Sequence, residues 1–127
     1  MFRREIGDLH RLADRYRDVA HFLTVYISEA HPDDGWRLQE NVREGFVFNE
    51  PKTWEERSRL ARVFVERYAW RLPVAVDNLD NRVERDYAAW PDRLYVIARG
   101  GRILYKGKPG PFGFKPEEVS RTLDRIR

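Results

Sequence analysis

The sequence predicts an α/β fold in which helices connect parallel strands, and an antiparallel hairpin and a last helix follow. Residues 22–27 (Phe-Leu-Thr-Val-Tyr-Ile) are apolar on both sides of the pleat and rich in β-branched and aromatic side chains, as in a strand buried on both faces. Gly100-Gly101 separates two further runs of this kind, which is a strong hairpin signal. At 127 residues the chain is long enough for a domain with its own core, so we expect a single domain over residues 1–127.

The first part of the chain reads as a helix, a strand and a long connection. Apolar residues recur at steps of three and four over residues 2–20, which predicts an amphipathic helix that leads into the strand at 22–27. Residues 37–52 show no sustained period and are typical of an irregular connection, in which we expect one short strand at 45–48.

A capping box begins the second helix, with Thr53 as the N-cap and Glu56 at the third helical position. This helix ends before a second buried strand at residues 73–77, and turn residues then lead to a short polar helix that stops before Pro91. The hairpin strands at 93–98 and 102–107 come next. Pro116 then begins the terminal helix, because proline suits the first helical position.

Composition excludes several classes of function. The 24 basic and 21 acidic residues give a net charge of +3, and both signs alternate at helical spacing, as on solvated faces rather than in a nucleic-acid-binding stripe. No apolar run is long enough to span a bilayer and no secretory signal is visible, so we expect a cytoplasmic protein without membrane or nucleic-acid partners. The absence of cysteine excludes a disulfide framework, a thiolate zinc site and a Cys-x-x-Cys motif. We expect no cofactor and no metal.

Titratable side chains gather directly after the strand at 22–27, where open α/β sheets place their sites. Glu29 and His31 are two residues apart and would share a face if the strand geometry continues. Histidine is the natural proton donor near neutral pH, and a neighbouring carboxylate would fix its tautomer. The alternative interpretation is a solvated turn after a core strand.

Several stretches that together span nearly the whole chain carry a resemblance to a known family. They are Tyr26-Ile27-x-Glu29-Ala30-His31-Pro32-x-Asp34-Gly35-Trp36, Glu56-Arg57, Pro73-Val74-x-Val76-Asp77, Tyr87-x-Ala89, Asp92-Arg93-Leu94-Tyr95-Val96-Ile97, Ile103-Leu104-Tyr105-Lys106-Gly107 and Gly110-Pro111. These stretches resemble the thioredoxin-fold core of the iodothyronine deiodinases and their bacterial deiodinase-like relatives. The resemblance implies a thioredoxin-like fold of peroxiredoxin-type layout, in which residues 73–77 supply the extra strand.

The resemblance also implies an oxidoreductase whose nucleophile is selenocysteine or cysteine. In the family this nucleophile ends the first strand and is followed closely by Pro and then by Phe at the start of the first helix. Phe2 occupies that Phe position. We therefore expect the nucleophile and its strand to lie just upstream of Met1, and we expect the 127-residue chain alone to be inactive.

The resemblance gives roles to particular residues. Glu29 and His31 match the family's Glu and His, which are thought to handle protons and the substrate hydroxyl, and they are the catalytic candidates. Tyr26, Arg93 and Trp36 are the substrate-binding candidates. Arg93 follows Pro91, where peroxiredoxin-like domains often keep an Arg near the nucleophile; the alternative is an ordinary ion-pairing Arg.

Two departures from the family concern the substrate. Pro51 stands where many deiodinases have a second His, and Pro109 stands where some of them carry a basic residue. Both departures weaken the case for a thyroid hormone in particular. They favour a more general chalcogen-based reductase.

Two classes of function stay open. The first is a deiodinase-like oxidoreductase that reduces a halogenated aromatic, a peroxide or a disulfide with a thiol as reductant, including a peroxiredoxin-like peroxidase when full length. The second is a non-enzymatic thioredoxin-fold binding or interaction domain. The retained family stretches favour the first class, and the absence of cysteine favours the second for the chain as given.

The expected layout places the strand upstream of Met1 in the centre of the sheet, between the strands at 22–27 and 93–97. The right-handed crossover rule gives this order, because the first helix must connect that strand to a parallel neighbour. Without it, both neighbours would have an unpaired apolar edge. Such edges pair with each other, take a strand from a second copy to form a homodimer, or make the chain poorly soluble.

Overall fold

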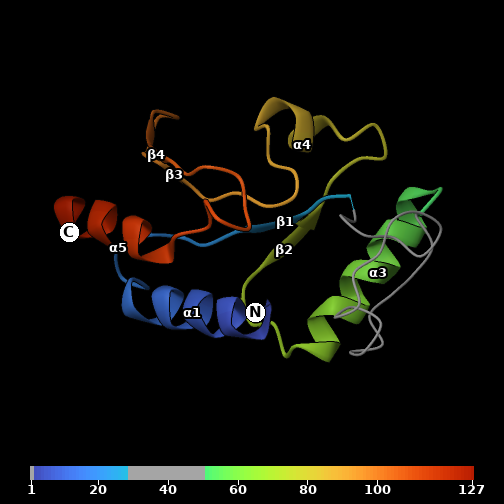
Figure 1. Ribbon diagram of the computed structural model, residues 1–127, viewed down its shortest axis with the longest axis horizontal. Coiled ribbons are helices and arrows are strands. Elements are labelled where there is room, and N and C mark those ends of the chain that lie inside the picture. The colour runs from blue at the N-terminus through green and yellow to red at the C-terminus, as the bar shows by residue number, and fades with distance from the viewer. Residues whose placement is uncertain (1, 29–50) are drawn as a thin grey trace.

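The computed structural model describes residues 2–28 and 51–127, and its elements follow the order predicted from the sequence (Figure 1). Their bounds are α1 (Phe2–Arg15), β1 (Thr24–Tyr26), α3 (Trp54–Arg67), β2 (Val74–Val76), α4 (Arg82–Asp86), β3 (Tyr95–Ile97), β4 (Ile103–Lys106) and α5 (Pro116–Ile126). This is a mixed α/β architecture, compatible with a thioredoxin-like fold. None of the helices in the described ranges is long and apolar enough to cross a membrane.

The described strands form two separate two-stranded sheets. β1 pairs with β2 in parallel, with Thr24 opposite Val74 and Tyr26 opposite Val76. β3 pairs with β4 in antiparallel fashion, and a register shift follows Val96. No ladder joins β1 to β3 among the residues that the structure describes.

The hydrogen bonds of β1 are directed to one side. The Thr24 amide donates to the carbonyl of Pro73 (2.8 Å), and the Asp77 amide donates to the carbonyl of Tyr26 (2.9 Å). Because backbone groups alternate in direction along a strand, the N–H and C=O of Val25 face the edge away from β2.

β3 has the same one-sided pattern. The Gly107 amide donates to the carbonyl of Leu94 (2.9 Å), and the Ala98 amide donates to the carbonyl of Arg102 (2.7 Å). The backbone groups of Tyr95 and Ile97 therefore face the edge away from β4. Each of the two sheets thus has an edge on β1 or β3 with no ladder partner in the described part of the chain.

Helix α1 joins the two sheets through its side chains. Its second half supplies Leu12, and Tyr16 directly after it, to a core cluster with β3 and α5, completed by Val96, Val119 and Leu123. Its first half supplies Ile6 to a cluster with α3 and the chain after it, completed by Phe64, Tyr68 and Trp70. Leu9 packs against both clusters. The fold therefore connects its sheets by apolar packing on one helix.

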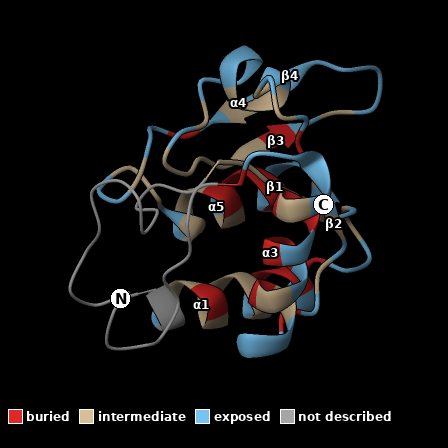
Figure 2. Cartoon of the chain, turned by 90° about the vertical axis from the view of Figure 1, so that its right-hand side faces the viewer, coloured by how far each residue is buried: buried red, intermediate tan, exposed pale blue. Residues whose placement is uncertain are grey.

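The helices cover the two faces of the strands unequally. Helices α1, α3 and α5 lie on one side, and the short helix α4 lies on the other (Figure 1). Figure 2 shows buried residues on α1, α3, α5 and β3, in the middle of the molecule, and mostly exposed residues around α4 and β4.

This unequal cover explains why β1 differs from its prediction. The sequence predicts a strand over residues 22–27 that is buried on both faces. The strand spans only Thr24–Tyr26, its residues are half-buried, and Leu23 is 66% exposed. In the described part of the chain β1 has one ladder partner and one well-covered face, and its apolar sequence is not enough to bury it.

Local signals at element ends are confirmed. Thr53 Oγ1 accepts the amide of Glu56 (3.1 Å), as the capping box predicts, while the Glu56 carboxylate accepts the amide of Lys52 (2.7 Å). Gly100 and Gly101 have φ values of +95° and +97°, which a side chain would disfavour. The predicted strand at 45–48 lies outside the described residues.

A polar contact fastens α1 to the start of β2. His10 Nε2 accepts the amide of Arg71 (3.2 Å), and its ring lies 5.0 Å from the ring of Trp70. The Arg71 guanidinium makes two bonds to the Asp14 carboxylate (3.1 and 3.2 Å). Burial and the nearby Arg71 lower the pKa of His10, and Asp14 opposes them.

This contact predicts a pH dependence of stability. Because the pKa of His10 is lower in the folded state than its ordinary 6.5, the unfolded chain binds the proton more readily. The contribution of His10 to stability is therefore present above about pH 6.5 and is lost as the pH falls through the lowered pKa. His10→Gln, which keeps an acceptor but does not titrate, should lose less stability on acidification than the unaltered chain. The difference should be below about 1 kcal/mol, because solvent screens this partly exposed group.

Urea melts across the acid range check this expectation, with His21→Gln as the matched control because His21 is an exposed histidine near the other end of the same helical region. Parallel pH profiles for His10→Gln and the unaltered chain would contradict it.

Candidate functional site

Three predicted site residues, Glu29, His31 and Trp36, lie outside the described residues. Ser28 directly precedes this segment and lies two residues after the end of β1. The structure therefore describes the elements around the candidate site and not the candidate catalytic residues Glu29 and His31.

Glu84 fastens the end of β1 to helix α4. Its carboxylate accepts both the hydroxyl and the amide of Ser28, the amide at 3.3 Å. Two hydrogen bonds to one residue fix both the backbone and the side chain there. The chain thus leaves β1 from a defined position.

Asp77 anchors the same helix to the end of β2. Its side chain is 2% exposed, and its two oxygens accept the amides of Asn78 (2.8 Å), Val83 (3.0 Å) and Glu84 (3.0 Å). A carboxylate at a helix start satisfies N–H groups that have no helical partner. The carboxyl end of β2 and the first turn of α4 therefore form one unit.

Arg57 of α3 adds further hydrogen bonds at the end of β2 and the start of α4. It is 2% exposed and donates to the carbonyl of Asn78 (2.7 Å), more weakly to the carbonyl of Asp77 (3.4 Å), and to Asn81 Oδ1 (2.8 Å). The carboxyl ends of β1 and β2, α3 and α4 are thereby held together by buried polar groups, which become costly if a partner is removed.

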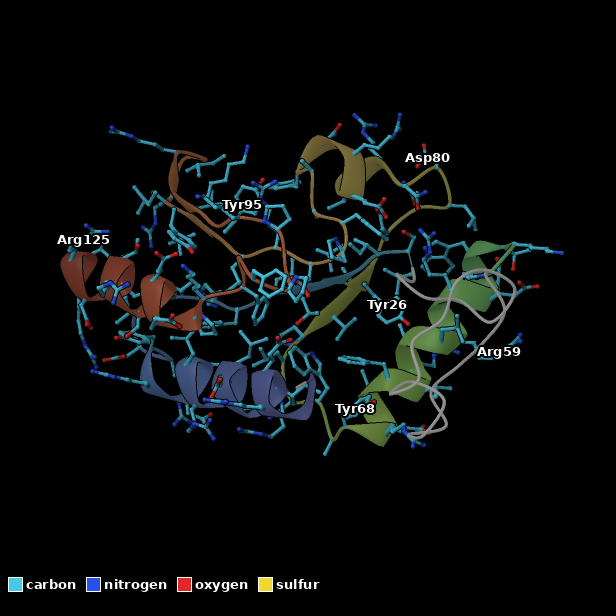
Figure 3. The ribbon with its side chains drawn as sticks, in the orientation of Figure 1. Tyr26, Arg59, Tyr68, Asp80, Tyr95 and Arg125 are labelled. Atoms are coloured by element: carbon cyan, nitrogen blue, oxygen red, sulfur yellow. The ribbon has the colours of Figure 1, made fainter. Side chains whose placement is uncertain are left out.

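Tyr26, a substrate-binding candidate, lies between the β1–β2 pair and α3 (Figure 3). Its ring packs 5.9 Å from that of Phe64, within the partly buried surroundings of the α1–α3 cluster. Its assignment to substrate stays a prediction.

Arg93, the other described candidate, bridges two backbone segments. Its Nε donates to the carbonyl of Gly107 (2.5 Å) and its Nη1 donates to the carbonyl of Ala88 (2.8 Å). These bonds tie the end of α4 to the loop after β4. The side chain is half-buried, so a role toward substrate stays a prediction beside this observed structural one.

Asp92, beside Arg93, is the most unusual carboxyl in the described part of the chain. Its Oδ1 is buried without a hydrogen-bond partner among the described residues. Burial raises the pKa of Asp92, and the amide of Gly110 lowers it in part. The two segments lie close together: a Cβ built on Gly110 would lie 1.8 Å from Asp92 Oδ1, so a larger residue there would displace the Asp92 carboxyl.

Glu5 in the first turns of α1 lies within electrostatic range of Asp92. Burial and then the charge of Asp92 raise the pKa of Glu5. The pKa values of both carboxyls are therefore raised, and Asp92 contributes to the raised pKa of Glu5. Carboxyls whose pKa is perturbed by burial and by a neighbouring carboxyl occur often at functional sites.

Neither a metal cluster nor the most evident cavity coincides with these carboxyls. Among the described residues, no group of three or more His, Cys, Asp or Glu side chains could hold a metal ion. A cavity of about 280 Å³ lies between α3 and β2, where its polar lining includes Ser58, Arg62 and Glu66. The chemistry of the site therefore points to Asp92 rather than to this cavity.

Sequence reasoning missed Asp92, Glu5 and Glu84. Asp92 falls within one of the family-like stretches, next to the candidate Arg93, so a signal was present. Glu5 and Glu84 read as members of mixed-charge helix faces, and nothing in their spacing distinguishes them.

Comparison with known proteins gives a consistent result. A family model described as iodothyronine deiodinase matches residues 1–127. The chain is 36% identical over 120 residues to type I iodothyronine deiodinase of Xenopus laevis, covering 94% of this chain and 45% of that protein. It is 38% identical over 128 residues to thyroxine 5-deiodinase of Gallus gallus (99% and 47%) and 31% identical over 126 residues to type II iodothyronine deiodinase of Rattus norvegicus (98% and 47%). The chain thus spans about half the length of these curated relatives.

The burial of Asp92 predicts a stability cost. Its pKa is raised in the folded state, so the contribution of its protonated form is present at low pH and is lost as the pH rises through that pKa. Asp92→Asn should therefore raise stability at neutral pH, by at most about 1 kcal/mol because the group is partly exposed. Thermal melts at acidic and neutral pH measure this, with the exposed Asp86→Asn as control. A loss of stability at neutral pH in Asp92→Asn would contradict the expectation.

Proposed function

Because the chain belongs to the iodothyronine deiodinase family, we propose that it is part of an oxidoreductase that removes halogen from an aromatic ring at the expense of a thiol. The observation that carries the proposal is the family match over residues 1–127. The raised pKa values of Asp92 and Glu5 support it, because reductive dehalogenation needs a proton source.

The proposed reaction balances with two thiols. A selenolate or thiolate takes the iodine from the ring carbon, that carbon takes a proton, and an enzyme selenenyl or sulfenyl iodide forms. A first thiol displaces iodide and gives a mixed disulfide or selenenyl sulfide. A second thiol restores the nucleophile and leaves as a disulfide. The net change is loss of iodine from the ring as iodide and oxidation of two thiols.

Residues of this chain would supply the proton and orient the ring. We assign proton transfer to His31, assisted by Glu29, as the family resemblance implies. Asp92 is a second proton source, supported by its burial and its raised pKa. Tyr26, Arg93 and Trp36 are assigned to substrate binding. No residue of the chain itself is a cysteine, and we assign the nucleophile to a residue upstream of Phe2, as the family resemblance implies.

The same residues would supply the missing centre of the sheet. The edges of β1 and β3 have no ladder partner in the described ranges, and α1 packs beneath both strands. We propose a peroxiredoxin-type layout in which a preceding strand pairs with β1 on one side and β3 on the other. Without that strand, pairing with a second copy would satisfy the same edges as a homodimer.

A second candidate function is a non-enzymatic interaction domain. The observation that favours it is the absence of cysteine from the 127 residues. A full-length peroxidase is a third alternative, since the same nucleophile could be oxidised by a peroxide. Turnover of the different substrates by an extended protein distinguishes these.

The first functional prediction concerns the nucleophile. An extended protein, in which a strand and a cysteine precede Met1, should release iodide from an iodinated phenol with dithiothreitol as reductant. The 127-residue chain should release none above a heat-treated control, because no side chain in it can accept and return the iodine. Iodide release by the short chain would refute the proposed source of the nucleophile. A folded but inactive extended protein would favour the interaction domain.

The second functional prediction concerns His31 in the extended protein. His31→Ala should lower turnover by about 10²–10⁴, the usual effect of losing a positioned general acid. Stability should change by no more than about 1 kcal/mol if the side chain lies outside the core. His10→Ala is a poor control because His10 holds Arg71, whereas His21→Ala is a suitable one. Full activity in His31→Ala would remove this residue from the mechanism.

A further inference from the structure

The chain from β3 to the start of α5 has an excess of positive charge. Residues 93–116 contain no acidic residue and six basic ones, which are Arg93, Arg99, Arg102, Lys106, Lys108 and Lys115. The whole chain has 24 basic and 21 acidic residues, so the residues outside this segment together have a net charge of −3. The positive charge of the protein is therefore concentrated in one segment.

The positive charges of this segment are exposed and unpaired. All of its basic side chains except the half-buried Arg93 are exposed, and in the described part of the chain none of these exposed ones forms an ion pair. The neighbouring helix α4 does not compensate them, because it has two basic and two acidic residues, and its Asp86 pairs with its own Arg82 (3.8 Å). The segment is thus free to attract an anionic partner.

The two faces of the β3–β4 hairpin differ in what covers them. Val96 is buried in the core cluster with α5, and Tyr105, its partner on β4, packs against the same cluster. Side chains alternate between the faces along a strand, so Tyr95 and Ile97 lie on the other face. We call this the outer face of the hairpin, and it consists of the cross-strand pairs Ile97–Ile103 and Tyr95–Lys106.

The outer face combines exposed apolar side chains with positive charges. Ile97 is 47% exposed and Ile103 is 51% exposed, and side chains that face each other across an antiparallel pair have Cβ atoms about 5 Å apart. The two isoleucines therefore form one exposed apolar patch. Arg102 directly precedes Ile103, and Arg99 follows Ile97 by two residues, so the positive charges lie at the border of the patch.

The neighbouring elements leave this patch open. The ring of Tyr87, at the end of α4, lies 5.0 Å from the ring of Tyr95 and covers that end of the outer face. The turn of the hairpin, at Gly100-Gly101, points away from α1 (Figure 1). The isoleucine pair between these two ends is therefore accessible.

We infer that the outer face of the hairpin binds the surface of an anionic lipid bilayer. The isoleucine pair would lie at the boundary between headgroups and acyl chains, and Arg99, Arg102 and Lys106 would contact the anionic headgroups. Binding to a membrane surface increases with the apolar area buried and with the attraction between basic side chains and anionic lipids, and this face offers both. Attachment to one surface requires no helix that crosses the membrane.

The charge and chemistry of the outer face disfavour two other partners. A second copy of the chain would bring two positively charged faces together, and like charges repel. Single-stranded nucleic acid stacks its bases on aromatic side chains, whereas the centre of the accessible patch is a pair of isoleucines.

This inference differs from the expectation that the protein has no membrane partner. That expectation came from the lack of a spanning apolar run and from the alternating charges of the predicted helices. Residues 93–116 do not follow this alternation, and the composition of the whole chain conceals their local excess of positive charge.

Co-sedimentation of the 127-residue chain with lipid vesicles tests the inference. The chain should bind vesicles of phosphatidylcholine mixed with phosphatidylserine and should not bind vesicles of phosphatidylcholine alone. Binding should weaken as NaCl is added, because salt screens the attraction. Lack of binding to the mixed vesicles, or equal binding to both kinds, would overturn the inference.

The contribution of charge is tested in the hairpin turn. Arg99→Gln combined with Arg102→Gln should weaken binding to the mixed vesicles by about 5- to 25-fold, since each basic residue near an anionic surface contributes about fivefold. Arg99→Lys combined with Arg102→Lys should retain binding. The matched control is Arg59→Gln combined with Arg67→Gln, which removes the same charge from exposed positions of α3. An equal loss in the control would show a general effect of net charge and would contradict the inference.

The contribution of the apolar patch is tested at Ile103. Ile103→Ser should weaken binding to the mixed vesicles by about 3- to 10-fold, because a half-exposed isoleucine loses its remaining contact with water on binding. The matched control is Ile126→Ser on α5, whose side chain has the same exposed fraction of 51%. Circular dichroism checks that each variant is folded, and the turn variants remain decisive if Ile103→Ser is not. Unchanged binding in a folded Ile103→Ser variant would overturn the inference.

Two further measurements identify a different partner. Tighter binding of a single-stranded oligonucleotide than of the mixed vesicles would assign the face to nucleic acid. A dimer in sedimentation equilibrium that Ile103→Ser dissociates would assign it to a second copy. Either result would replace the inference.

The inference goes beyond the proposed function and can fail independently of it. None of the residues altered in these tests is assigned to substrate binding or proton transfer, so the same variants of an active extended protein should release iodide normally in solution without vesicles.

Discussion

The packing of helix α1 against both sheets is the constraint on which the structure depends. Ile6 lies in the cluster formed with α3, Tyr16 lies in the cluster formed with β3 and α5, and Leu9 touches both. No backbone ladder joins β1 to β3 in the described part of the chain, so apolar side chains on one helix carry the connection. Such packing sets the separation of the sheets but leaves backbone groups at their facing edges without ladder partners. Glu5 lies in the first turns of the same helix, within electrostatic range of Asp92. The position of this part of the site therefore depends on how α1 packs against the two sheets.

Two kinds of buried polar group lie around the candidate site: some have several hydrogen-bond partners, and one has an oxygen without a partner among the described residues. Asp77 and Arg57 are buried and bonded to several partners, so they stabilise the ends of β2 and α4. Asp92 has a buried oxygen with no partner among the described residues, and its carboxylate form is destabilised. Carboxyls with pKa values perturbed in this way are candidates for functional sites. The hydrogen bonds of Asp77 and Arg57 fix the position of elements that surround Asp92.

How well the sequence predicted each feature depends on how local its cause is. The order of the elements, the capping box at Thr53 and the glycine turn at Gly100 depend on neighbouring residues, and all were predictable. The half-burial of β1 was not, because its apolar sequence cannot tell how many strands and helices cover it. Nor was the burial of Asp92, which arises from contact with Gly110 on a distant loop. The proposed catalytic pair, Glu29 and His31, lies outside the described residues and rests on the family resemblance.

The central claim is that a preceding strand pairs with both β1 and β3, and hydrogen exchange tests it most directly. At a concentration where the 127-residue chain is monomeric, the amides of Val25, Tyr95 and Ile97 should exchange quickly, because they face the open edges. The amides of Thr24 and Ala98, which donate to Pro73 and Arg102, should exchange slowly. In the extended protein all five should be slow. The claim would be contradicted if Val25, Tyr95 and Ile97 were as protected as Thr24 in the short chain, or stayed fast in a folded extended protein.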